Sequence, residues 1–470
     1  MNKINEYDTI ASIASPVSKG GIGIIRISGS QALPIIRRIF MPHNEKWKNR
    51  DLESYRIYYG NILENMGRED EKIIDECIIL VMKSPNSYTR EDVVEIDCHG
   101  GIVVIKRILD LVIREGARIA EPGEFTKRAF LNGRIDLSQA EAVMDLIESK
   151  NDMARQNSMD QLKGSLSEKI RSLREEILYQ IAYIESALDD PEHYDLDGFG
   201  ESLDQKCGQW IKELDKLISS YSNGRMISEG IRTCIVGKPN AGKSSFLNAL
   251  LGEERAIVTE IAGTTRDTLE EYITIDGITL HLVDTAGIRD TDDRVESIGV
   301  ERALQELEKA DLVLFLMDRS GEITEEDLSI IDQIQDKKKI VLLNKSDLDD
   351  QVLSIRKIRQ YFSDQVPILS ISAKYSEGIS LFHEELKKMM FHGKMDRKDD
   401  VVITNERHKA LLGEGLQSIR NVSESIRQLM PEDFYTIDLM DAYESLGKIL
   451  GESVDDDLAN EIFSRFCTGK

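Results

Sequence analysis

Residues 231–251 read Ile-Arg-Thr-Cys-Ile-Val-Gly-Lys-Pro-Asn-Ala-Gly-Lys-Ser-Ser-Phe-Leu-Asn-Ala-Leu-Leu, and this segment sets the class of fold. The apolar run 231–236 predicts a short buried strand, and the apolar residues after Ser244 predict a helix. Between them, residues 237–244 match GxxxxGK[ST], whose backbone N–H groups and lysine hold phosphates and whose serine binds Mg²⁺. The segment therefore predicts an α/β domain with a phosphate-binding loop.

Further apolar runs at 278–283, 311–317, 340–344 and 368–371 predict the other buried strands of a doubly wound α/β domain. Four polar motifs follow in order along this domain. They are Gly263-Thr264-Thr265-Arg266-Asp267, Asp284-Thr285-Ala286-Gly287, Asn344-Lys345-Ser346-Asp347 and Ser372-Ala373-Lys374. The first can complete a Mg²⁺ shell with a threonine, and the second places an Asp behind the metal and a glycine N–H near the γ-phosphate.

The third motif selects the base. The Asp347 carboxylate can accept hydrogen bonds from N1–H and the exocyclic amine of guanine, whereas adenine presents an acceptor at that edge. A buried carboxylate facing adenine would lose several kcal/mol. The tripeptide 372–374 supplies backbone groups for the guanine O6. We therefore expect GTP rather than ATP.

Hydrolysis needs a polar group for the attacking water, and Ras-type GTPases place a glutamine directly after the second motif. Here that place is Ile288, which cannot orient water. Asn240, inside the phosphate loop, can offer its amide oxygen to a monovalent cation such as potassium, although asparagine also favours tight turns. The acidic candidates for the water are Asp290, Asp292, Asp293 and Glu296, and the alternative is charge on a solvated loop.

The flanking sequence predicts two more units in this chain of 470 residues. Short β-rich segments between 9 and 119, such as 23–27, 78–82 and 93–97, indicate an α+β domain. Ser138 with Glu141 predicts a capping box at the start of a long helical stretch, and 405–429 and 437–450 predict further helices before a last helical turn. One apolar stripe should face a helix-bundle core: Leu162, Leu166, Ile170, Leu173, Ile177, Ile181, Ile184 and Leu188.

Charge and composition limit the partners. Lys and Arg number 60 against 85 Asp and Glu, a net charge of −25, so nucleic-acid binding must be local. The N-terminus lacks a signal peptide's hydrophobic stretch, no apolar run is long enough to span a membrane, and the cysteines form no CxxC pair, which favours a cytoplasmic protein. The five cysteines are Cys77, Cys98, Cys207, Cys234 and Cys467.

Several segments together resemble the tRNA-modification GTPases of the MnmE, or TrmE, family. They are the motifs 237–244, 263–267 and 284–289, the runs 20–29, 91–101 and 122–133, and the ending Cys467-Thr468-Gly469-Lys470. The resemblance covers essentially the whole chain. It implies a folate-binding, dimerising N-terminal α+β domain at 1–120, a helical domain at 121–222 and 391–470, and a Ras-like G domain inserted between them at 223–390.

The resemblance also assigns site residues by motif position. K⁺ would be held by Asn240, Thr259, Ile261 and Thr264, and Mg²⁺ by Ser244 and Thr265, while Glu296 would position the catalytic water. The nucleotide contacts would come from Asn240, Ala241, Gly242, Lys243, Ser244, Ser245, Thr259, Glu260, Ile261, Ala262, Gly263, Thr264, Thr265, Asp284, Thr285, Ala286, Gly287, Asn344, Lys345, Asp347, Ser372, Ala373 and Lys374.

For 5-formyltetrahydrofolate the matching positions are Arg26, Glu95, Arg134 and Lys470. Cations for the glutamyl carboxylates and an acid for the pterin edge are suitable types. Position 134 is Arg where some relatives carry Lys, and Thr468 stands where an aliphatic residue is more usual. Cys467 is a candidate tail thiol, but no histidine adjoins it, and a Cys near a chain end is as often inert.

The family implies K⁺-dependent hydrolysis of GTP to GDP and phosphate by a homodimer. With an FAD- and NADH-dependent subunit, MnmG or GidA, in a heterotetramer, it adds an aminomethyl or carboxymethylaminomethyl group to C5 of the wobble uridine of certain tRNAs. The one-carbon unit comes from 5,10-methylenetetrahydrofolate. Two alternatives stay open, a ribosome-assembly GTPase and a purely regulatory switch.

Overall fold

The computed structural model describes residues 8–48, 50–190, 193, 196–252, 257–258, 271–275, 277–283, 307–349, 352–391, 401–453, 456–464, 466 and 469. The chain forms two compact units. One consists of residues 1–144, 162–174 and 446–470, and the other of residues 145–161 and 175–445. None of the helices in the described ranges is long and apolar enough to cross a membrane.

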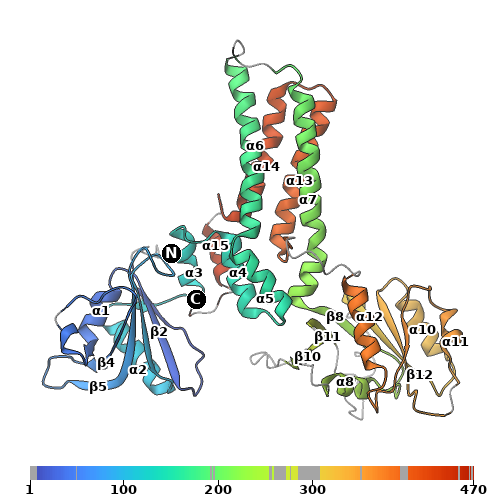
Figure 1. The fold of residues 1–470 in the computed structure, drawn as a ribbon, viewed down its shortest axis with the longest axis horizontal. Coiled ribbons are helices and arrows are strands. Elements are labelled where there is room, and N and C mark those ends of the chain that lie inside the picture. The colour runs from blue at the N-terminus through green and yellow to red at the C-terminus, as the bar shows by residue number, and fades with distance from the viewer. Residues whose placement is uncertain are drawn as a thin grey trace. The chain divides into compact units, whose positions relative to one another are not determined.

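The first unit contains a seven-stranded sheet in the order β3-β4-β5-β6-β2-β1-β7. Neighbouring strands run antiparallel except β1 and β7. The strands are β1 (Ile10–Ile13), β2 (Ile22–Ser28), β3 (Phe40–Pro42), β4 (Arg56–Glu64), β5 (Lys72–Met82), β6 (Val93–His99) and β7 (Arg118–Ile119). Helices α1 (Ala32–Ile39) and α2 (Ile102–Arg114) bury their apolar sides in one core with the sheet, and a 3₁₀ turn, η1, covers Glu45–Trp47 (Figure 1). The predicted α+β character of this segment is confirmed.

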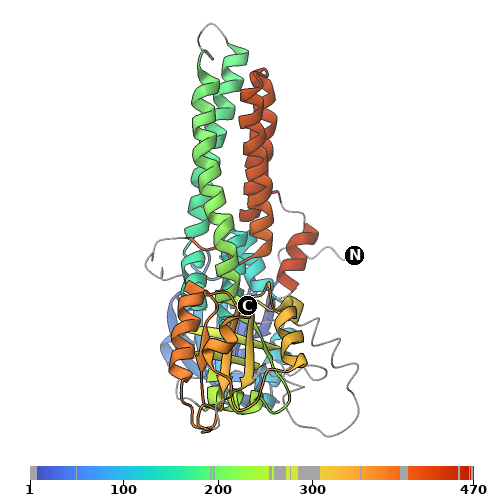
Figure 2. The ribbon, with the colours of Figure 1, turned by 90° about the vertical axis from the view of Figure 1, so that its right-hand side faces the viewer.

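Helices, several of them long, make up most of the segments before and after the second sheet. They are α3 (Glu124–Leu131), α4 (Leu137–Glu148), α5 (Asp152–Leu162), α6 (Ser165–Asp189), α7 (Phe199–Glu229), α13 (Glu406–Arg427), α14 (Glu432–Leu450) and α15 (Asp456–Ser464). Figures 1 and 2 both show α6 and α7 beside α13 and α14. The close approach of α7 to the chain before α13 depends on Gly224, where a Cβ would lie 2.1 Å from the Ile403 carbonyl oxygen.

The predicted apolar stripe lies largely in this helical core, because Leu166, Ile170, Leu173, Ile177, Ile181 and Ile184 are all at most 5% exposed. Leu188, however, is 50% exposed, because α6 ends one residue later at Asp189 and the bundle has ended there. The predicted capping box at Ser138 is wrong. The box is formed by Asp136 and Gln139: the Gln139 N–H donates to Asp136 Oδ1 (3.0 Å), and the Asp136 N–H donates to Gln139 Oε1 (3.0 Å).

The second unit contains a sheet in the order β14-β13-β12-β8-β11-β10-β9. Strands β14, β13, β12, β8 and β11 are parallel, and β10 and β9 extend the sheet antiparallel. The strands are β8 (Ile231–Val236), β9 (Ile257–Val258), β10 (Glu271–Ile275), β11 (Ile278–Val283), β12 (Leu312–Asp318), β13 (Lys339–Asn344) and β14 (Ile368–Ser370). The accompanying helices are α8 (Lys243–Leu251), α10 (Glu325–Gln333), α11 (Ile355–Arg359) and α12 (Ile379–Phe391).

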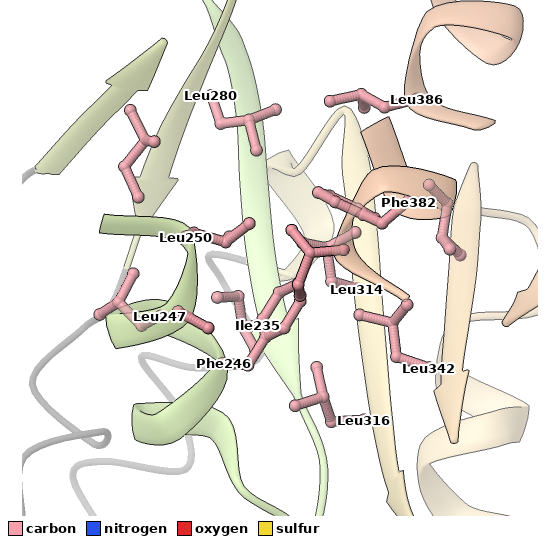
Figure 3. Close-up of a cluster of buried hydrophobic side chains, with 14 of the residues drawn as sticks. Ile235, Phe246, Leu247, Leu250, Leu280, Leu314, Leu316, Leu342, Phe382 and Leu386 are labelled. Carbon is pink, nitrogen blue, oxygen red and sulfur yellow. The ribbon is translucent and has the colours of Figure 1, made fainter. Parts of the chain in front are cut away.

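Alternation along the parallel strands divides their side chains between two cores. Figure 3 shows one core, in which Phe246 and Leu250 of α8 and Phe382 of α12 lie around Leu314 and Leu342 of the sheet. The intervening strand residues, such as Phe315 and Val341, join the core that α10 and α11 cover. Helices thus cover both faces, as the predicted doubly wound arrangement requires.

Candidate nucleotide-binding site

Strand β8 connects toward β9, β10 and β11 on one side of it, whereas its other neighbour, β12, connects toward β13 on the opposite side, so the connections from these two adjacent strands leave in opposite directions. In open α/β sheets, ligands bind at such a switch point, outside the carboxyl ends of the strands. The described motifs all follow carboxyl ends: 237–244 follows β8, 344–347 ends β13, and 372–374 follows β14.

The loop after β8 depends on backbone conformations that few residue types adopt. Gly237 has φ +151 and Gly242 has φ +96. A Cβ on Gly237 would lie 2.3 Å from the Leu316 carbonyl oxygen, and one on Gly242 would lie 2.1 Å from Asn344 Nδ2. The two glycines of the motif therefore let the loop pack against β12 and β13.

Asn240, between them, is exposed and has φ 63, a left-handed conformation that asparagine tolerates better than most residues. Its side chain is exposed to solvent. The structure therefore gives Asn240 a turn role and leaves its amide accessible.

Helix α8 starts at Lys243 with Gly242 as its N-cap, which has no side-chain capping hydrogen bond. Such a helix start presents N–H groups and a partial positive charge to an anion. Lys243 Nζ donates to the carbonyl oxygens of Gly237 (2.7 Å) and Lys238 (3.0 Å), and burial lowers the pKa of this ammonium. Ser244 and Ser245 are in the first turn, at the start of the helix. The position of Ser244 in the first turn is consistent with the predicted role of its hydroxyl as a Mg²⁺ ligand.

Asn344 joins the described loops of the site. Its side chain is 3% exposed, and Nδ2 donates to the Ala241 carbonyl oxygen (2.9 Å). Its Oδ1 accepts a hydrogen bond from the Ala373 N–H (2.9 Å). One carboxamide thus ties the phosphate loop to the loop after β14, a role that the motif by itself did not reveal.

Asp347, the predicted guanine acceptor, is exposed, and a hydrogen bond orients its carboxylate. The Ser372 hydroxyl, which is fully buried, donates to Asp347 Oδ1 (2.7 Å). The motif predicts only backbone groups from this tripeptide, so the hydroxyl of Ser372 is an addition. Lys374 is exposed, with its ammonium 4.9 Å from the centroid of the Tyr375 ring.

Lys345 has φ 65, and its ammonium lies 2.6 Å from Asp318 Oδ2 at the end of β12. Burial raises the pKa of Asp318, but hydrogen bonds from Lys345 and Ser320 outweigh this and hold it below its usual value. Asp318 belongs to none of the sequence motifs. Its only signal was an acidic residue closing an otherwise apolar strand.

Other predicted residues lie outside the described ranges. They are Thr259, Glu260, Ile261, Ala262, Gly263, Thr264, Thr265, Asp284, Thr285, Ala286, Gly287, Ile288, Asp290, Asp292, Asp293, Glu296, Cys467 and Lys470. Among the residues that are described, no group of three or more His, Cys, Asp or Glu side chains could hold a metal ion.

The candidate folate residues in the first unit gather around Tyr88, which the sequence pattern did not reveal. Arg134 lies with its guanidinium 4.6 Å from the Tyr88 ring centroid and donates to the Tyr88 carbonyl oxygen (3.1 Å). Arg26 lies 5.9 Å from the same centroid, and its Nε is 2.7 Å from Glu95 Oε1. It also donates to the Gly469 carbonyl oxygen (3.2 Å). Glu95 and Arg26 therefore form an ion pair with each other and lie side by side.

Comparison with known proteins agrees with this organisation. Residues 9–134 match the family described as the GTP-binding protein TrmE N-terminus, and residues 137–467 match the family described as the MnmE helical domain. A tRNA modification GTPase MnmE from Lachnoclostridium phytofermentans is 52% identical over 463 residues, covering 98% of this chain and 99% of the relative. The protein of the same name from Clostridioides difficile is 46% identical over 467 residues, with the same coverage of 98% and 99%.

Among solved structures, that of an Aquifex aeolicus Era variant bound to GDP.AlF4- shares 29% identity, covers 40% of this chain and 65% of that chain, and has a TM-score of 0.28. So low a score has no weight beside the near full-length relatives. Those relatives, together with the two family matches, place the protein. The chain belongs to the MnmE family of tRNA modification GTPases.

Proposed function

We propose that the chain binds GTP at the carboxyl ends of β8, β13 and β14 and hydrolyses it to GDP and phosphate during modification of tRNA. The observation that carries this proposal is Asn344, whose carboxamide brings the phosphate loop and the loop after β14 together at one edge of the sheet. Asp347 lies on the loop after β13, and the hydrogen bond from the Ser372 hydroxyl orients its exposed carboxylate.

Each residue of the proposed site has a defined task, and one of them, Thr265, lies outside the described residues. Lys243 moves from the two loop carbonyls to the β and γ oxygens, while the N–H groups at the start of α8 hold the β-phosphate. Ser244 and Thr265 would hold Mg²⁺, which neutralises charge on the phosphates. Asp347 accepts the two donors of guanine, with Ser372 keeping its carboxylate oriented.

A test of the base assignment is Asp347→Asn. The asparagine Oδ1 can keep the Ser372 hydrogen bond, but an N–H donor replaces the second carboxylate oxygen. Guanine presents an amine there and xanthine presents a carbonyl, so the variant should lose affinity for GTP and gain affinity for XTP, measured by competition with a fluorescent nucleotide. Wild-type GTP affinity in this variant would refute the assignment.

We propose further that potassium activates hydrolysis between two copies of the G domain, with Asn240, Thr259, Ile261 and Thr264 as ligands. The exposed, left-handed Asn240 supports this. Hydrolysis should be much faster in KCl than in NaCl. Asn240→Gly suits φ 63 and removes only the amide, so it should still bind GDP but lose the advantage of KCl. Equal wild-type hydrolysis rates in KCl and NaCl would refute the potassium proposal.

Glu296 is proposed to position the attacking water. Glu296→Ala should slow turnover while leaving GTP affinity nearly unchanged. Single-turnover hydrolysis and nucleotide binding, measured on the same preparation, separate the two effects. A large loss of binding would count against this role.

The N-terminal unit is proposed to bind 5-formyl- or 5,10-methylenetetrahydrofolate. Arg26, Glu95 and Arg134 around Tyr88 support this, with Lys470 as a fourth contact. Arg134→Met should weaken binding of 5-formyltetrahydrofolate in calorimetry. Arg114→Met is the control, because Arg114 is an exposed arginine paired with Glu64 in the same unit. Equal losses in the two variants would show a general charge effect.

We propose domains at 1–120, 121–222 with 391–470, and 223–390, and a cytoplasmic homodimer that acts with the FAD-binding subunit MnmG on the wobble uridine of tRNA. The curated relatives carry tRNA modification in their names, which supports the reaction class. Mass spectrometry of wobble uridines from cells with and without this protein tests it. Unchanged nucleosides, with tight binding of ribosomal RNA, would favour the ribosome-assembly alternative.

A further inference from the structure

Lys238 is the centre of the phosphate loop's internal hydrogen bonds. Its carbonyl oxygen accepts from Lys243 Nζ (3.0 Å) and from the Ala241 N–H (3.2 Å). Both residues belong to the part of the loop that would contact phosphate. The position of this carbonyl therefore affects how the loop presents Lys243 and the N–H groups before α8.

The side chain of Lys238 leaves the loop and reaches the start of α10. Its ammonium lies 2.6 Å from Asp327 Oδ2 and donates to the Thr324 hydroxyl (3.1 Å). Asp327 is 1% exposed, while Lys238 keeps 21% of its side-chain surface. The pair is thus mostly shielded from water, where a charge interaction is stronger than on an open surface.

Asp327 does more than cap the start of α10. Its Oδ2 accepts the Thr324 N–H (2.9 Å), which closes the capping box of α10, and accepts the Lys238 ammonium as well. Its other oxygen, Oδ1, is buried and has no hydrogen-bond partner. A capping box requires only the reciprocal hydrogen bonds of its two residues and not the burial of the carboxylate. Complete burial of the carboxylate against a loop lysine is therefore not explained by capping alone.

The same connection between β12 and α10 also holds the guanine side of the site. Just before this connection, Asp318 at the end of β12 pairs with Lys345 (2.6 Å), and the N–H of the next residue, Arg319, donates to the Asn344 carbonyl oxygen (3.0 Å). Residues 318–327, which we call the bracket, thus have one ion pair to the base loop and one to the phosphate loop.

We propose that Asp327 is a positioning residue for the phosphate loop, acting through Lys238, and that the bracket fixes the phosphate loop relative to the guanine loop. The inference rests on the proposed nucleotide site and deepens it. Asp327 does not touch the nucleotide. It fixes the position of the Lys238 carbonyl oxygen, which accepts a hydrogen bond from Lys243 Nζ in the absence of nucleotide.

The ligand dependence of binding separates this proposal from a purely structural role. GDP carries the β-phosphate that the loop holds, and GMP does not. Asp327→Asn keeps the volume and the capping acceptor but removes the charge. We expect it to weaken GDP binding about tenfold and GMP binding less than about twofold, the size of losing one charged hydrogen bond. Asp318→Asn should weaken both ligands by similar factors.

Lys238→Met provides a second variant that does not alter the cap of α10. It should reproduce the effect of Asp327→Asn, and the double variant should be no weaker than either single one, because both remove the same pair. Glu326→Gln is the matched control, since it removes an exposed charge from the same helix turn and should change neither ligand's affinity.

Affinities are measured by displacement of a fluorescent GDP, with urea unfolding of each variant alongside. Parallel losses of GDP and GMP in Asp327→Asn, or additive losses in the double variant, would overturn the positioning role. If Asp327→Asn does not fold, unchanged GDP affinity in Lys238→Met overturns it as well. Failure of the wild-type protein to bind GDP would instead reject the proposed function.

Discussion

Gly242→Ala should disrupt the nucleotide site from a position that makes no side-chain contact. Gly242 has φ +96, and an added Cβ would lie 2.1 Å from Asn344 Nδ2 and 3.4 Å from its Cγ. Asn344 cannot move aside freely. It is 3% exposed, and both ends of its carboxamide are hydrogen-bonded, to Ala241 and to Ala373.

The expected cost follows from two effects. A left-handed conformation costs a residue with a Cβ about 1–2 kcal/mol. Displacing the Asn344 carboxamide breaks its two buried hydrogen bonds, each contributing about 1 kcal/mol. Unfolding free energy should therefore fall by about 3–4 kcal/mol. GDP affinity should fall at least about tenfold, because the loops that Asn344 joins no longer keep their positions.

Urea unfolding and displacement of a fluorescent GDP measure the two quantities. Gly321→Ala is the matched control, because Gly321 lies in a loop of the same domain, has no left-handed φ, and has nothing within 4 Å of the added Cβ. It should change stability by less than about 0.5 kcal/mol. Stability within about 1 kcal/mol of wild type and normal GDP affinity in Gly242→Ala would refute the reasoning.

Three further predictions concern single interactions. Lys243→Met should lower GTP affinity at least about a hundredfold but shift the melting temperature little, because within the described residues its ammonium donates to just two loop carbonyls; a comparable loss of stability would contradict this. Asn151→Ala should cost about 2 kcal/mol in urea unfolding, since its carboxamide bonds Thr279 and caps α5, and a loss below about 0.5 kcal/mol would be inconsistent. Burial raises the pKa of Glu124, but Arg118, the Glu121 N–H and Arg128 outweigh burial and hold this pKa below its ordinary value of 4.5. The ionised Glu124 carboxylate therefore stabilises the fold above pH 4.5, and this stabilisation is lost as the pH falls through the pKa of the folded state. Arg118→Met should therefore destabilise by about 2 kcal/mol at pH 7, and the deficit should shrink as pH falls below about 4.5; a deficit independent of pH would exclude this origin.

Much of the second sheet was predictable because its central strands are buried on both faces. The predicted strands 231–236 and 278–283 coincide with β8 and β11. The strands 340–344 and 368–371 differ from β13 and β14 by one residue at one end, and 311–317 differs from β12 by one residue at each end. A strand between two layers of helices must be apolar at nearly every position, so its ends are marked by the first polar or glycine residue.

Helix ends were less predictable, because several residues nearby could form the same cap. Ser138 and Glu141 fit the capping pattern, but so do Asp136 and Gln139, and packing of Leu137 and Ala140 in the core with Phe463 settles the helix on the earlier pair. The relevant contact is with a residue near the other end of the sequence. Local pattern therefore gave the helix but not its first turn.

The site residues divide in the same way. Motif residues are recognisable because each is proposed to contact a ligand whose chemistry is fixed, while their supports are ordinary residues placed by the fold. Asp318, Asp327 and Tyr88 carry no motif of their own, and each becomes visible only through a partner elsewhere in the sequence.

Asn240 shows why two interpretations of one residue need not compete. From the sequence, it is either a cation ligand or a residue suited to a tight turn. The structure places it at φ 63 with an exposed side chain, so the turn conformation leaves the amide accessible. Glycine would make the same turn without a ligand, and most other residues would carry a side chain but strain the turn. Asparagine satisfies both requirements, which is why the backbone conformation supports a ligand role instead of replacing it.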